Sequence, residues 1–155
     1  YEPNPDEMDD PDKLRTLIEN ARRLGRDDLV LRCQAQIARL AGNEYDDELE
    51  QEFWQAVHMA GEISLANTGK KTPLTKTRQK FRRDGAQKCI ADFATRSDFT
   101  DGYRLLTDAG YQELTFEAVL LRHPDQFTPE DVKKVRKKLE KAEPAKAEPG
   151  EAASE

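Results

Sequence analysis

The sequence has no long run of apolar residues. A helix that crosses a membrane shows about 18 or more consecutive apolar residues, and no such run occurs in this chain. The first residues also lack the basic and then apolar pattern of a secretory signal peptide. We therefore expect a cytoplasmic protein that does not enter a membrane.

Cysteine and histidine are scarce as well. The two cysteines, Cys33 and Cys89, and the two histidines, His58 and His123, lie far apart along the chain. Structural zinc sites are usually built from local pairs such as CxxC or HxxxH, and neither pattern occurs here. We expect no metal site and no cofactor, and we expect both cysteines to be buried thiols.

The common catalytic motifs are also missing. There is no nucleophile elbow, P-loop, glycine-rich dinucleotide motif or HExxH. Residues 124–125 and 131–133 literally match the PD…(D/E)xK pattern of nucleases, but Asp131 falls in the first turn of a predicted helix, where it can cap the helix end. We therefore expect a protein that is not an enzyme. A site assembled from scattered acidic residues is the remaining catalytic alternative.

What the sequence does have is helical periodicity. Apolar residues recur three and four positions apart, and glycine or proline interrupts the pattern at intervals. Apolar and charged residues each make up 36% of the chain, so each helix can bury only one stripe. We predict an all-α fold, a single irregular or orthogonal bundle of about seven to eight short helices.

The predicted boundaries follow the composition. Acidic residues and proline dominate the beginning of the chain, and Lys, Ala, Glu and Pro dominate its end, so neither stretch can form a packed core. We predict a flexible acidic arm (1–10), a helical domain (11–142) and a disordered tail (143–155). Within the domain we expect an αα-hairpin (11–42), a long helix (46–66) and C-terminal helices (73–142).

Two details of the C-terminal helices can be predicted. Gly85 lies inside a helical pattern and is expected to break or bend that helix. Residues 114–122 are apolar on most sides, which suggests a buried helix, although so short a run can also be a strand.

The distribution of charge is the most distinctive feature. The net charge is −6, yet residues 68–96 contain nine basic and two acidic residues, a local net charge of +7. Threonine and glutamine are interleaved with the basic residues, and all these side chains can contact phosphate oxygens. We predict an accessory or regulatory module that binds nucleic acid, with duplex DNA as the expected form. The residues expected to bind it are Lys70, Lys71, Lys76, Arg78, Lys80, Arg82, Arg83 and Lys88.

The alternative is a protein–protein interaction module that uses the same charged surfaces, either docking an acidic protein partner on the basic face or offering its acidic arm to a basic partner. Basic residues on an exposed helix are often only a solvated face, and the acidic stretch 44–52 could neutralise them within the fold or between copies. A helix-turn-helix around Gly85 is a further alternative. Residues 77–85 and 114–125 resemble a bacterial helical module of unassigned role, which implies a bacterial protein but assigns no function to any residue.

Overall fold

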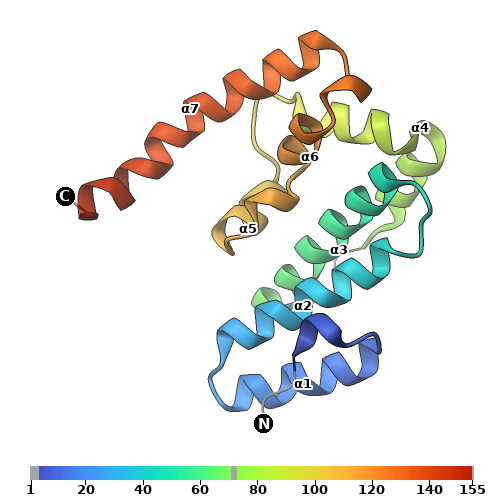
Figure 1. The fold of residues 1–155 in the computed structure, drawn as a ribbon, viewed down its shortest axis with the longest axis vertical. Coiled ribbons are helices and arrows are strands. Elements are labelled where there is room, and N and C mark those ends of the chain that lie inside the picture. Colours follow the sequence, from blue (N-terminus) through green and yellow to red (C-terminus); the bar gives the residue numbers. More distant parts are fainter. Residues whose placement is uncertain (1–3, 71–72, 155) are drawn as a thin grey trace.

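The computed structural model describes residues 4–70 and 73–154, with side chains described as far as residue 142. This part of the chain contains helices and no strand, which confirms the predicted all-α class (Figure 1). None of its helices is both long and apolar enough to span a membrane. The α-helices are α1 (Pro11–Arg23), α2 (Asp27–Gly42), α3 (Glu48–Thr68), α4 (Thr75–Ala94), α5 (Asp101–Asp108), α6 (Phe116–Arg122) and α7 (Pro129–Ser154). Three short 3-10 helices are η1 (Pro5–Glu7), η2 (Gln112–Leu114) and η3 (Pro124–Gln126).

The predicted αα-hairpin is formed by α1 and α2. Asp10 caps α1 by accepting a hydrogen bond from the Asp12 amide, and Pro11 occupies the first helical position. Gly25, with φ of +70°, allows the chain to turn into α2. The two helices enclose their own small core around Leu14 and Cys33, with α1 at one end of the molecule (Figure 1).

The third helix connects this hairpin to the C-terminal half. It packs against α2, α4, α5 and α6, so the predicted long helix has a central position. Asp47 caps it, and α2 approaches it closely at Gly42, where a Cβ atom would lie 2.6 Å from the Gln51 carbonyl oxygen. Only glycine permits this approach between the two backbones.

The fourth helix is bent at Gly85, as the sequence predicts. Gly85 has φ of 84° and ψ of 166°, which is a region reserved almost entirely for glycine. The first half of α4 therefore runs in a different direction from the second half, which begins at Ala86. The helix starts at Thr75, with Leu74 as the residue before it, slightly later than the start predicted at residue 73.

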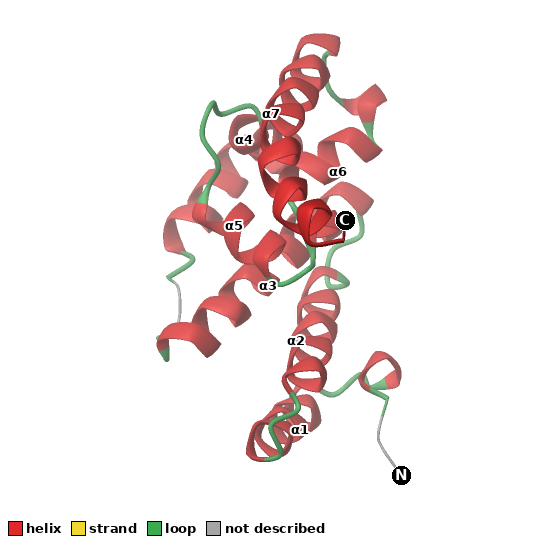
Figure 2. Ribbon diagram, turned by 90° about the vertical axis from the view of Figure 1, so that its left-hand side faces the viewer, coloured by secondary structure: helices red, strands yellow, loops and turns green. Residues whose placement is uncertain are grey.

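The C-terminal helices form the largest core. Residues 114–122, which the sequence left open between helix and strand, contain the helix α6, capped by the Thr115 side chain. Phe53 and Trp54 of α3, the second half of α4, and Val132 and Val135 of α7 pack around α6. Figures 1 and 2 both show α1 and α2 at one end of the molecule and α4, α6 and α7 at the other.

Both ends of the chain include some regular structure. Residues 4–10 lie on α2: Pro5 is buried, and Gln36 of α2 donates a 2.7 Å hydrogen bond to the Met8 carbonyl. Residues 1–3 of the predicted arm lie outside the described residues. At the other end α7 extends to Ser154.

Candidate nucleic-acid interface

The predicted basic segment covers the last residue of α3, the connection to α4 and all of α4. Gly69, with φ of +75°, ends α3, and Lys70 follows it fully on the surface. Lys71 lies outside the described residues. The first half of α4 carries Lys76, Arg78, Lys80, Arg82 and Arg83, and the second half carries Lys88.

Three of these cations are bound by acidic residues of the same helix. Lys80 Nζ lies 3.0 Å from Asp84 Oδ2 and 2.7 Å from Asp92 Oδ2. Arg83 binds Asp84 at 3.1 Å, and Lys88 Nζ lies 3.6 Å from Asp92 Oδ1. In a straight helix, positions 80 and 92 would be about 18 Å apart along the axis. The bend at Gly85 therefore brings Lys80 to Asp92 and joins two sets of local ion pairs into one network.

The network changes the acidity of its members. Hydrogen bonds from Arg83 and then Lys80 lower the pKa of the Asp84 carboxyl from 3.8 to about 2. The hydrogen bond from Lys80 likewise lowers the pKa of Asp92, and hydrogen bonds to Asp92 and Asp84 raise the pKa of Lys80. All these groups are therefore charged at neutral pH, and the two carboxylates cancel much of the positive charge of their partners.

Arg78 has a different partner. Its guanidinium carbon lies 5.3 Å from the centre of the Trp54 ring, which is buried, while the arginine side chain stays exposed. Phe81, on the inner side of the same helix, packs edge-on against Trp54 at 5.1 Å. Phe81 thus packs against the core and does not offer a ring for base stacking. Arg78, in contrast, contributes its charge to the surface.

Besides Arg78, three predicted residues make no ion pair with the described part of the chain. They are exposed and lie at the end of α3 and on the first half of α4: Lys70, Lys76 and Arg82. The ion pairs of Glu52, in the acidic stretch 44–52, go instead to Arg122 at the end of α6 and to His123 directly after it. Within the described residues, no ion pair joins 44–52 to 68–96.

A second basic surface, on α7, escaped the sequence prediction. Six basic residues occur between residues 133 and 141, against the single acid Glu140. Four of them are exposed and form no ion pair within the described residues: Lys133, Arg136, Lys137 and Lys141. Counting the basic residues of this stretch in the sequence would have been enough to find it.

The two parts of the sequence carry opposite net charge. Residues 1–67 contain 16 acidic and 7 basic residues, a net charge of −9, whereas residues 68–142 contain 11 acidic and 17 basic residues, a net charge of +6. The first group includes α1, α2 and α3, and the second includes α4 and α7 at the opposite end from the hairpin (Figure 1). A polyanion would be attracted to the α4 and α7 end.

The residues considered for zinc are not gathered in one place. Cys33 is buried in the hairpin core and Cys89 in the core around α6, and burial raises the pKa of both thiols. The prediction of two buried, unbridged cysteines is confirmed. His58 lies beside Trp54, and burial lowers its pKa. His123 instead contacts Glu52 and, with Glu48, belongs to a separate group of potential metal ligands.

An apolar pocket of about 340 Å³ lies between α3, α4, α5 and α6. Its walls include Val57, Phe93 and Phe116, and its carboxylates are Asp101 and Glu117. Lys138 already holds Glu117, at 2.7 Å. Among the described residues, this pocket does not bring together the several free carboxylates that the catalytic alternative requires.

Comparisons of the chain with protein families, with curated proteins and with solved structures found no significant match.

Proposed function

We propose that this protein is a non-catalytic module that binds nucleic acid, in the form of duplex DNA, through the exposed cations of the α3–α4 loop and the first half of α4. The proposal includes the bacterial and cytoplasmic setting expected from the sequence. One observation carries it: Lys70, Lys76 and Arg82 are exposed and have no carboxylate partner among the described residues, in a chain with a net charge of −6.

These cations are suited to binding phosphate because they have no ion pair with the described residues to break first. A cation that already forms an ion pair must break that pair before it can neutralise a phosphate. A solvated cation breaks no ion pair, and its binding releases counterions from the DNA. Arg78 also qualifies, since its contact with Trp54 leaves the side chain exposed. Contacts to phosphate fix position and affinity but carry no base sequence, so the expected binding is independent of sequence.

Neighbouring arginines provide a sharp test. Arg82 and Arg83 are both exposed, but only Arg83 is bound by Asp84. We expect Arg82→Ala to weaken binding to a labelled 20-base-pair duplex at 50 mM salt by about tenfold, the value of one phosphate contact at that salt. Arg83→Ala should change the affinity much less. Fluorescence anisotropy measures both affinities under the same conditions.

Two results would overturn the proposal. One is an absence of binding by the wild-type protein at 50 mM salt. The other is an equal loss in both arginine variants, which would show that the ion pairs do not decide which cations bind. A cellular partner that remains bound after nuclease treatment, in either case, would favour the protein-interaction alternative.

A further inference from the structure

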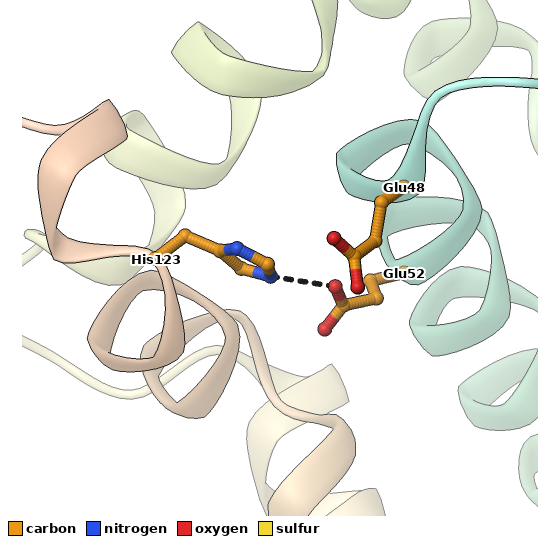
Figure 3. Close-up of side chains that lie close together, drawn as sticks. All are labelled: Glu48, Glu52 and His123. Atoms are coloured by element: carbon orange, nitrogen blue, oxygen red, sulfur yellow. Dashed lines mark hydrogen bonds and ion pairs between the residues drawn. The ribbon is translucent and has the colours of Figure 1, made fainter.

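Three metal-ligating side chains meet where α3 and α6 adjoin, away from the basic segment. Glu48 and Glu52 lie one turn apart near the start of α3 and so share a face of that helix. His123 directly follows α6. Figure 3 shows the His123 ring and both carboxylates pointing toward one another. One ligand atom from each residue lies within 4.8 Å of the other two.

The carboxylate of Glu52 is held in place from both sides. Arg122 Nη2 donates to Glu52 Oε1 at 2.6 Å, and His123 Nε2 lies 2.7 Å from Glu52 Oε2. Arg122 also donates to the Glu113 carbonyl at 2.6 Å, which anchors the guanidinium itself. Arg122 thus orients Glu52 so that its second oxygen faces the imidazole, as a supporting residue does in many metal sites.

Glu48 completes the group without being needed for the fold. Its side chain is exposed and takes part in no hydrogen bond or ion pair with the described residues. The side chains of Glu52 and His123 are only 17% and 15% exposed. The site therefore combines two positioned ligands with a third that can move, at the edge of a surface hollow lined also by Arg39, Asn43 and Gln55.

We propose that Glu48, Glu52 and His123 bind a divalent transition-metal ion, with Zn²⁺ as the expected ion. An imidazole nitrogen favours zinc and its neighbours in the transition series over Mg²⁺ and Ca²⁺, which prefer oxygen ligands alone. Three protein ligands leave one tetrahedral position, and the adjoining hollow gives water access to it. The three residues of this site lie outside the basic segment 68–96.

The required movements are small. Zinc lies about 2.0–2.1 Å from nitrogen and oxygen ligands, so two tetrahedral ligands are about 3.3 Å apart. The 2.7 Å separation of His123 Nε2 and Glu52 Oε2 would widen by about 0.6 Å as the metal replaces their hydrogen bond. The carboxylate of Glu48 would approach by side-chain rotation. Arg122 could keep its contact with the other oxygen of Glu52 throughout.

The test uses the full chain after treatment with a chelator. Titration calorimetry with Zn²⁺ should give one ion per chain with a Kd of about 10 µM or tighter, and Co²⁺ should give the visible absorption of a tetrahedral site. Glu48→Gln should weaken binding at least tenfold, and His123→Gln should abolish it. Glu50→Gln is the matched control, because it removes one charge from the same turn of α3. This variant should bind Zn²⁺ as the wild type does.

The inference is wrong if Zn²⁺ binds more weakly than about 10 µM, or if either Glu48→Gln or His123→Gln binds Zn²⁺ as the wild type does. His123→Gln removes a contact between helices and could unfold the chain, but Glu48→Gln removes no contact with the described residues. Circular dichroism of Glu48→Gln therefore separates a lost ligand from a lost fold. Unchanged zinc affinity in a folded Glu48→Gln protein would contradict the proposed ligand set.

Discussion

Replacing Lys138 with methionine should strongly destabilise this protein. The ammonium group of Lys138 lies 2.7 Å from Glu117 Oε2, 3.1 Å from the Ala94 carbonyl oxygen and 4.7 Å from the centre of the Phe99 ring. The side chains of Lys138 and Glu117 are only 7% and 3% exposed. Methionine keeps most of the volume of lysine but leaves the buried carboxylate of Glu117 without its cation.

The size of the effect follows from this burial. Removing one partner of a buried ion pair costs about 3–5 kcal/mol, because the remaining charge is neither solvated nor paired. A protein of this length loses about 2–4 °C of Tm for each kcal/mol, so we expect the Tm to fall by about 6–20 °C. Removing both charges, with Glu117→Gln and Lys138→Met together, should recover at least about 2 kcal/mol of the single-variant loss.

Thermal and urea unfolding followed by circular dichroism at pH 7 measure these differences. Lys137→Met is the matched control, since Lys137 is the exposed neighbour without an ion pair among the described residues. We expect its stability to stay within about 0.5 kcal/mol of the wild type. A loss below about 1 kcal/mol in Lys138→Met would refute the reasoning, as would a double variant whose loss equals the sum of the single losses.

Two further predictions concern packing and pH. Gly42→Ala should destabilise the protein by about 1–3 kcal/mol, because the new Cβ would meet the Gln51 carbonyl, whereas Gly61→Ala, with nothing within 4 Å, should stabilise it by up to about 1 kcal/mol. The reverse order in urea unfolding would contradict the close approach of α2 and α3. The pKa of Asp84 is lowered to about 2 in the folded protein, so its contribution to stability is present above pH 3.8 and is lost as the pH falls through 2. Asp84→Asn should therefore lower the Tm at pH 5, with a difference from the wild type that shrinks toward pH 2, and a difference independent of pH would contradict the network.

Much of the fold could be predicted because its signals are local. Asp10 before Pro11 and Thr115 before Phe116 cap helices through contacts between near neighbours, and Gly85 bends α4 because of its own backbone freedom. The docking of residues 4–10 on α2 could not be predicted this way. It depends on Gln36 reaching the Met8 carbonyl, which is a contact between residues distant in sequence.

The candidate sites likewise combine features that local sequence predicts with contacts between residues distant in sequence. Composition alone indicated a basic α4, but the contact of Lys80 with Asp92 depends on the bend that brings these two residues together. The group formed by Glu52 and His123 joins residues 71 positions apart, so no spacing rule could reveal it. The basic residues of α7 needed only to be counted, but their exposure could be established only from the packing of α7 against the core.

The salt dependence of DNA binding tests the central claim most directly. Four exposed cations, Lys70, Lys76, Arg78 and Arg82, should neutralise about four phosphates and give a slope of about −3.6 in log K against log salt. Affinity for duplex DNA should then fall about 150-fold between 50 and 200 mM salt. A slope near zero, or no binding at 50 mM salt, would contradict the assignment of these residues to a nucleic-acid interface.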